Sequence, residues 1–325
     1  MKICARIAVL AAGLMMAASV VNAAGVEVDP ALPEYEPRET VGGNLRSVGS
    51  DTMVNLMQLW ASRFRAVHPS VRVQVEGKGS STAPPALLKR QSQFGPMSRQ
   101  MEEEEIDRFV DQFGHKPTGL RVAIDCIAVY VNKDNPIESL TLAQVEQIFS
   151  VAGPEKMTWG DVGLTDPVWR DRPITLTGRN SASGTYKYFK KVACGGHDYK
   201  PTVQESPGSA GVVNAVSRDV TAIGYSGIGY QTPDVREVPL SYEEGETPAP
   251  PTMEAAYTGD YPVARFLYLY LNYDKQKPLD PLRREFIRFI FSREGQEAVV
   301  KDGSFPISAD IARKELERVG IEPGF

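Results

Sequence analysis

Short strand-like stretches in this chain are repeatedly followed by a turn of small polar residues and then by a run with helical spacing. Residues 44–48 lead through the turn 49–52 into a helix-like run at 53–67, and residues 174–177 lead through a polar turn into a helix-like run at 186–192. Strand, turn and helix in this order favour an α/β fold with a parallel sheet. The turns of such a sheet align along one edge, where ligands bind.

The most specific motif lies in the turn before the second of these helix-like runs. A glycine stands there between two hydroxyl side chains, and a guanidinium lies four residues before the first hydroxyl. The start of a helix offers unpaired backbone N–H groups and the positive end of the helix dipole, and a glycine lets the backbone approach a ligand closely. The motif therefore predicts a site for a tetrahedral oxyanion. Its residues are Arg179, Ser183, Gly184 and Thr185.

Two strand-like stretches, residues 124–131 and 263–272, bracket a middle segment of the chain. The mature chain has about 300 residues, which fits two medium domains better than a single core. We therefore expect a discontinuous first domain made of residues 44–125 and 263–325, and a second domain made of residues 126–262. Two connections with a cleft between the domains are typical of a binding protein that closes on its ligand.

The first 23 residues have the layout of a secretory signal peptide. Lys2 and Arg6 precede an apolar run at residues 7–21, and a small-residue cleavage signal follows. An N-terminal membrane anchor is the alternative, but the run is shorter than the ~20 residues that a spanning helix needs. We expect a periplasmic or secreted protein. Residues 24–43 are rich in Pro and Glu and are predicted to form a flexible leader.

Charge and cysteine usage narrow the classes of partner. A formal net charge of -5 argues against nucleic acid, so an anion must be held by local donors rather than by the overall field. After cleavage of the signal peptide only Cys126 and Cys194 remain, either as a disulfide or as two free thiols. The three histidines are scattered and no CxxC pair occurs, so we expect no metal and no cofactor. We expect a monomer.

Three further turns with hydroxyl side chains lie in the other half of the chain. Each one alone is an ordinary helix cap in most proteins. Because the sheet places such turns on one side, we expect them to converge with the first motif on one ligand from the opposite domain. The predicted ligand-binding residues of these turns are Ser50, Asp51, Thr52, Ser80, Ser98 and Arg99.

Asp51 is unusual among these residues because a carboxylate repels a fully ionised anion. It accepts a hydrogen bond from a protonated one, and phosphate carries protons near neutral pH whereas sulfate does not. An acceptor at this place would therefore select phosphate over sulfate. The alternatives are that Asp51 is only a helix cap and that Arg99 forms an ion pair at the surface or between the domains.

With these motifs, the chain resembles the periplasmic phosphate-binding proteins of ABC phosphate importers, which have the type II periplasmic-binding fold. The resemblance extends over residues 44–308. It rests on the spacing from Arg179 to Ser183-Gly184-Thr185, on Gly49-Ser50-Asp51-Thr52 and on Gly77-Lys78-Gly79-Ser80-Ser81. The strand end at residues 132–136 and Ile223-Gly224-Tyr225 are also typical of the family.

The resemblance implies two α/β domains joined by two hinge crossings with a ligand cleft between them. It also implies inorganic phosphate as the ligand and the membrane subunits of an ABC permease as transient partners. One position departs from the pattern, because some members place an acidic acceptor directly after the serine of the third turn, where this chain has Arg99. Asp51 is our candidate to take over the acceptor role.

Two other functions are compatible with an oxyanion site. A secreted phosphatase on the same fold is one, but the sequence offers no evident nucleophile–base pair and no metal cluster, so we do not expect an enzyme. The other is a binding protein or sensor for a different tetrahedral oxyanion, working without a transporter.

Overall fold

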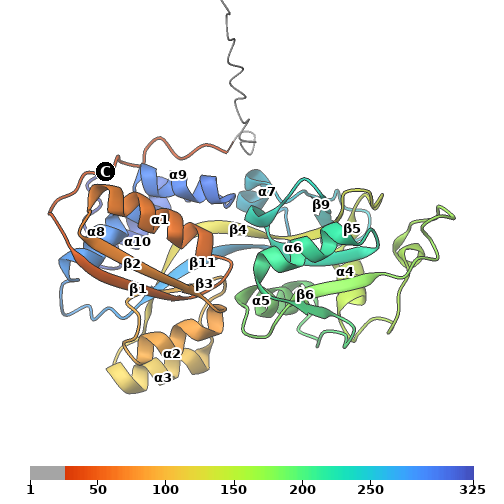
Figure 1. Ribbon diagram of the computed structural model, residues 1–325, viewed down its shortest axis with the longest axis horizontal. Coiled ribbons are helices and arrows are strands. Elements are labelled where there is room, and N and C mark those ends of the chain that lie inside the picture. Colours follow the sequence, from red (N-terminus) through yellow and green to blue (C-terminus); the bar gives the residue numbers. More distant parts are fainter. Residues whose placement is uncertain (1–25) are drawn as a thin grey trace, which may run out of the picture.

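The structure, a computed structural model, describes residues 26–325 and consists of two α/β units that lie side by side (Figure 1). Two long strands, β4 (Thr118–Asn132) and β11 (Ala264–Leu271), run through the middle of the molecule between the units. The predicted signal peptide at residues 1–23 lies outside the described residues. In the described part of the chain, every helix is too short or too polar to cross a membrane.

The first unit contains the N-terminal strands and the C-terminal helices. Besides β4 and β11, its elements are β1 (Gly43–Gly49), α1 (Val54–Val67), β2 (Val71–Gly77), α2 (Ala83–Leu88), β3 (Gly95–Met97), α3 (Glu103–Phe113), α8 (Pro281–Ile290), α9 (Arg293–Asp302) and α10 (Ala309–Glu317). Strands β1 and β2 pair in parallel, and β3 pairs with β11 in antiparallel direction. Val48 N–H donates to Phe94 O at 3.2 Å, which places β1 beside the chain that enters β3.

The second unit is formed by the middle of the chain. Its elements are β5 (Leu140–Thr141), α4 (Leu142–Phe149), β6 (Thr175–Arg179), α5 (Gly184–Ala193), β7 (Gln204–Ser206), α6 (Gly208–Arg218), β8 (Ala222–Gly227), β9 (Val235–Glu237), β10 (Leu240–Ser241) and α7 (Met253–Thr258). Strand β6 lies between β7 and β8 and is parallel to both. Strands β8 and β9 pair antiparallel with β4, and β5 and β10 form a separate parallel pair.

Strand β4 belongs to both units because it changes its pairing partner along its length. Its first part pairs with β11 up to Cys126, and its second part pairs with β8 from Ile127 onward. The sheet is therefore mixed rather than purely parallel, since β4 and β11 cross between units in opposite directions. We propose that the chain crosses between the two domains at two places: where β4 changes its pairing partner, and where the chain enters β11.

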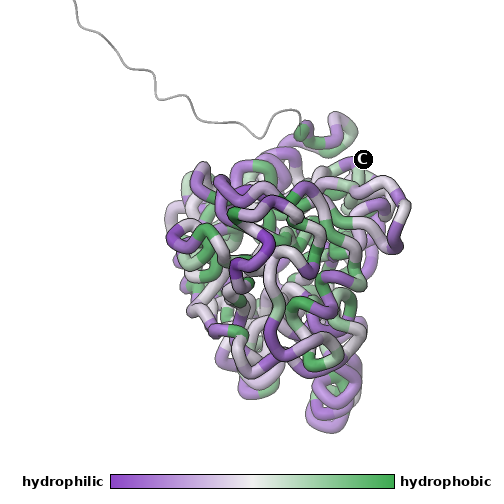
Figure 2. The backbone as a smooth tube through the Cα atoms, turned by 90° about the vertical axis from the view of Figure 1, so that its right-hand side faces the viewer, coloured by the Kyte–Doolittle hydropathy of each residue, from purple (hydrophilic) through white to green (hydrophobic). Residues whose placement is uncertain are grey.

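The C-terminal helices complete the core of the first unit. Trp60 of α1 is fully buried, and its indole N–H donates to the backbone oxygen of Gly295 in α9 at 2.8 Å. Phe64 of α1 packs edge-on against Phe286 of α8, with ring centroids 5.1 Å apart. In Figure 2 the hydrophobic segments gather inside the molecule and many hydrophilic segments lie at its outline. Residues 26–67 and 281–317 are thus parts of one packed unit.

Several sequence-based expectations differ from the structure. The segment predicted to be a flexible leader packs against the first unit, because Leu32 is buried and the Tyr35 hydroxyl donates to Glu285 of α8 at 2.8 Å. Helix α2 begins with two prolines near its start, which are tolerated because the first helical turn needs no backbone donors there. Helices α7 and α10 were not anticipated.

The two cysteines among residues 26–325 are free thiols in the structure. Cys126 lies in β4 and Cys194 ends α5, and both are buried. Burial raises the pKa of both thiols, that of Cys194 to about 12. A thiol with so high a pKa is a poor nucleophile near neutral pH, so both cysteines serve as small core residues.

We expect Trp60→Ala to lower the free energy of unfolding by about 3–5 kcal/mol, because it removes a fully buried ring and the hydrogen bond to α9. Urea unfolding followed by circular dichroism measures this change. As a control, Val168→Ala changes a side chain that is 61% exposed and should stay within about 0.5 kcal/mol of the parent. Equal midpoints for the parent and Trp60→Ala would contradict the packing of α1 on α9.

Candidate functional site

The predicted oxyanion motif forms the start of α5 in the second unit. Strand β6 ends at Arg179, and Ser183 is the N-cap of α5. The Ser183 hydroxyl oxygen accepts hydrogen bonds from the N–H groups of Thr185 at 3.1 Å and Tyr186 at 3.3 Å. Its own hydrogen is therefore left to donate elsewhere. Ser183 and Thr185 are both buried, so the helix start lies inside the molecule.

The three hydroxyl turns of the first unit meet one another. Ser98 Oγ lies 3.2 Å from Ser50 Oγ and 3.2 Å from Ser80 Oγ, and the Ser98 N–H donates to Ser80 Oγ at 3.0 Å. All three serines are buried. They follow the ends of β1 and β2, which form one parallel pair, and of β3, which pairs with β11 in the larger sheet. The turns therefore gather on one side of the first unit.

The hydroxyl turns of the first unit touch the start of α5 directly. Thr52 Oγ1 lies 3.0 Å from Thr185 Oγ1, and the Ser81 N–H donates to the Ala182 carbonyl at 3.1 Å. A Cβ placed on Gly184 would lie only 2.3 Å from Ser80 Oγ. The two units are thus in contact through the predicted site, and Gly184 permits the close approach.

Arg179 and Asp51 form an ion pair between the two units, through Arg179 Nη2 and Asp51 Oδ2. Arg179 Nη1 also donates to Ser209 Oγ at 2.8 Å, whereas its Nε is buried and has no hydrogen-bond partner. Asp51 does not cap α1, whose N-cap is Met53 with no side-chain hydrogen bond. The helix-cap alternative for Asp51 is therefore not what the structure contains.

Arg99 is the one predicted site residue whose charged group is engaged elsewhere. Its guanidinium donates to both carboxylate oxygens of Glu105 in α3, at 2.7 and 2.8 Å, and to Ser81 Oγ at 3.2 Å. Burial acts to raise the pKa of Glu105, but the hydrogen bonds and the charge of Arg99 outweigh it and hold that pKa below its usual value. Arg99 is thus ion-paired, but with a residue of its own unit and in a buried place, whereas the alternative was an ion pair at the surface or between the domains.

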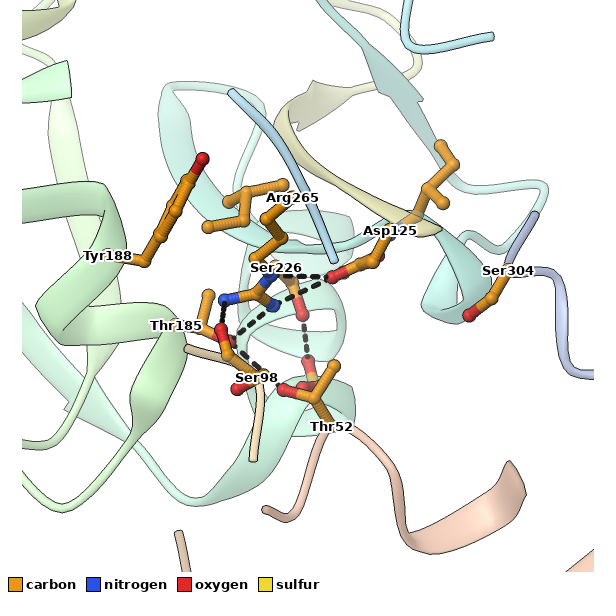
Figure 3. A network of polar contacts seen from close by, with 12 residues as sticks. Thr52, Ser98, Asp125, Thr185, Tyr188, Ser226, Arg265 and Ser304 are labelled. Atoms are coloured by element: carbon orange, nitrogen blue, oxygen red, sulfur yellow. Dashed lines mark hydrogen bonds and ion pairs between the residues drawn. The ribbon is translucent and has the colours of Figure 1, made fainter. Parts of the chain in front are cut away.

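A second buried ion pair, absent from the sequence-based prediction, lies beside the hydroxyl cluster (Figure 3). Asp125 of β4 and Arg265 of β11 are each 1% exposed at the side chain, and Arg265 Nε and Nη2 donate to Asp125 Oδ2 at 3.0 and 2.7 Å. Arg265 Nη1 donates to the Ser98 carbonyl at 2.8 Å, and Nη2 donates to Thr185 Oγ1 at 2.9 Å.

One signal in the sequence could have revealed this pair. Each of the two apolar strand-like runs, residues 124–131 and 263–272, contains a single charged residue, and a buried charge must find a partner. Burial raises the pKa of the Asp125 carboxyl, while the Arg265 guanidinium and the Ile228 N–H act in the opposite direction. Asp125 Oδ1 accepts from the Ile228 N–H at 3.2 Å, so this carboxylate also contacts the second unit.

The arrangement is suited to binding a small oxyanion. Hydroxyl groups, a helix start and two guanidiniums supply donors from both units, and most of these groups are buried. Hydrogen bonds to an anion are shorter and stronger than those between neutral groups. Among residues 26–325, no group of three or more His, Cys, Asp or Glu could hold a metal ion.

Comparisons with known proteins point to one family. Residues 35–294 match the model of the PBP superfamily domain. A phosphate-binding protein PstS of Pseudomonas aeruginosa is 46% identical over 96% of this chain and 98% of its own length. A phosphate-binding protein PstS of Bacillus subtilis is 27% identical over 92% of each chain.

Solved structures have the same architecture. A putative phosphate ABC transporter substrate-binding protein from Clostridium perfringens, solved with bound phosphate, has a TM-score of 0.70 and 25% identity and covers 82% of this chain and all of its own. An ABC-type phosphate transport receptor from Vibrio cholerae has a TM-score of 0.64, covers 81% of this chain and, at 23% identity, supports the fold.

We expect Gly184→Ala to hold the two units apart, because the added methyl group would lie 2.3 Å from Ser80 Oγ across the interface. Spin labels on Asp111→Cys in α3 and Val168→Cys in the second unit measure the separation by pulsed electron resonance. The distance distribution should move to longer values, while the melting temperature of each unit changes little because neither core is altered.

Gly211→Ala in α6 is the matched control, because its added Cβ would meet no atom closer than 3.3 Å. This control should keep the parent distance distribution. A Gly184→Ala variant with the parent distribution would contradict the close approach of α5 to the Ser80 turn.

Proposed function

This chain belongs to the PstS family of phosphate-binding proteins within the PBP superfamily, and we propose that it captures inorganic phosphate for an ABC phosphate importer. The observation that carries the proposal is the meeting of donors from two units at the start of α5, with Thr52 of one unit 3.0 Å from Thr185 of the other. The chain acts as a binding protein, so we assign no catalytic residue.

In the proposed binding mode, phosphate lies between the units and replaces contacts that the donors make with one another. The hydroxyl–hydroxyl contacts are neutral hydrogen bonds, which contribute about 0.5–1.5 kcal/mol each, whereas hydrogen bonds to a charged group contribute about 1.5–3 kcal/mol. Exchange of one kind for the other favours the closed arrangement. The proposed contacts are Ser50, Thr52, Ser80, Ser98, Arg179, Ser183, Gly184 and Thr185.

Asp51 and Arg179 have linked roles in this proposal. The ion pair holds the Arg179 guanidinium in place, and the unpartnered Arg179 Nε remains a donor for the ligand. Asp51 then has two roles. Its carboxylate orients Arg179, and it is also our candidate acceptor for the phosphate proton. Arg99 is left with a supporting role, since its guanidinium is held by Glu105.

We further propose that the chain acts in the periplasm and delivers its ligand to the membrane subunits of an ABC permease. The signal-peptide pattern of residues 1–23 supports export. The names of the relatives from Clostridium perfringens and Vibrio cholerae support an ABC transporter as the partner. We expect the contact with the permease to be transient and the protein to be a monomer.

A calorimetric titration tests the proposed ligand. We expect the wild-type chain to bind phosphate with a stoichiometry of one and to bind sulfate weakly. Arg179→Gln should weaken phosphate binding by about 10- to 100-fold, because it removes a buried charged donor. Arg170→Gln, at an exposed arginine of the same unit, is the control and should bind as the parent does. Binding of sulfate, molybdate or a sugar with no heat from phosphate would refute the proposal.

Asp51→Asn distinguishes the two proposed roles of the Asp51 carboxylate, orienting Arg179 and accepting the phosphate proton. If Asp51 accepts the phosphate proton, the substitution should erode discrimination against sulfate more than it weakens phosphate binding, because an amide can donate to sulfate. Competition titrations with both anions give the affinity ratio. An unchanged ratio with weaker binding of both anions would mean that Asp51 only holds Arg179.

A further inference from the structure

Arg265 is the point at which the crossing strands meet the hydroxyl cluster of both units. It lies in β11, and its guanidinium is held by Asp125 of the neighbouring strand β4. The remaining donors go to the Ser98 carbonyl of the first unit and to the Thr185 hydroxyl of the second. In Figure 3 the guanidinium lies between Asp125 and the pair formed by Ser98 and Thr185.

The bond to Thr185 decides which way that hydroxyl group donates. A guanidinium has only donors and is always charged, so Thr185 Oγ1 must be the acceptor in its 2.9 Å contact with Arg265 Nη2. The single hydrogen of Thr185 is then directed away from Arg265, toward the side where Thr52 Oγ1 lies 3.0 Å away. Thr185 is thus prepared as a donor for whatever anion lies among the turns.

Asp125 holds the Arg265 guanidinium in the orientation in which Nη2 donates to Thr185 Oγ1. Two nitrogens of Arg265 bond the same carboxylate oxygen, and the other oxygen is occupied by the Ile228 N–H of the second unit. The Asp125 side chain is 1% exposed, so these contacts and not water hold the carboxylate. The fork of Arg265 therefore has one arrangement, and lysine could not reproduce it.

We propose that Arg265, held by Asp125, is a positioning residue of the phosphate site that makes Thr185 a hydrogen-bond donor to the ligand and links ligand binding to the two crossing strands. This inference rests on the proposed function. In this inference Arg265 of β11 is the second arginine of the site. Arg99 is not, because its guanidinium is engaged by Glu105.

A double-mutant cycle on phosphate affinity tests this role. Arg265→Gln should weaken phosphate binding by about 10- to 100-fold, since it removes the group that orients Thr185. Thr185→Val removes the hydroxyl itself. If Arg265 acts through Thr185, Arg265→Gln should cost less than about threefold in the Thr185→Val background, because interacting sites are not additive.

Arg121→Gln is the matched control. Arg121 lies in β4 and pairs with the buried Glu315 of α10, so its loss also removes an ion pair on a crossing strand. Among the hydrogen bonds of the described residues, Arg121 makes none to the hydroxyl cluster. The phosphate affinity of Arg121→Gln should therefore equal that of the parent. Circular dichroism verifies that each variant folds. If Arg265→Gln does not fold, Arg265→Lys enters the same cycle, because it keeps the charge and loses the fork.

The outcomes separate this inference from the proposed function. A wild-type chain that takes up no phosphate would overturn the proposed function. A wild-type chain that binds phosphate, with Arg265→Gln or Arg265→Lys binding as well as Arg121→Gln does, would overturn the positioning role alone. Equal fold losses from the Arg265 substitution with and without the Thr185 hydroxyl would also overturn it, because Arg265 would then act independently of Thr185.

Discussion

One buried ion pair, Asp125 with Arg265, lies where the two crossing strands are side by side and makes hydrogen bonds to both units. Removing one partner of such a pair leaves a charge without water or counter-charge, at a cost of about 3–5 kcal/mol. The pair lies next to the place where β4 changes partner, between Cys126 and Ile127. The same contacts that neutralise the charge therefore connect the strands between the units with the ligand-binding turns.

Charges and hydroxyl groups have different tasks in the proposed site. The ion pairs Arg179–Asp51 and Arg265–Asp125 hold each guanidinium at a set place, so the orientation of the donors is established before a ligand arrives. The hydroxyl groups contact one another through neutral hydrogen bonds, within the first unit and, between Thr52 and Thr185, across the two units. Such bonds are individually weak. A rigid frame with exchangeable hydroxyl contacts suits a protein that must both bind and release an anion.

The candidate site could be read from sequence where its residues are close together in the chain. Ser183, Gly184 and Thr185 follow one another at the predicted helix start, and local hydrogen bonding alone places them there. Asp125 and Arg265 stand 140 positions apart in runs that otherwise indicate buried strands, and only their pairing register brings them together. The same limit applies to Arg99, whose sequence position predicted ligand contact although Glu105, in the first turn of α3, engages its guanidinium.

The sequence by itself determined the class of fold, the succession of strand, turn and helix at residues 44–67 and 174–192, the helix start at Ser183-Gly184-Thr185 and the chemistry of an oxyanion site, because these depend on neighbours in the chain and on side-chain type. Only the tertiary structure decided which charges meet. It paired Asp51 with Arg179 across the units, gave Arg99 to Glu105, placed Arg265 behind Thr185 and packed the N-terminal segment around Leu32 and Tyr35 onto the first unit. Ion pairs between distant segments follow from strand register and domain packing, which no local pattern specifies.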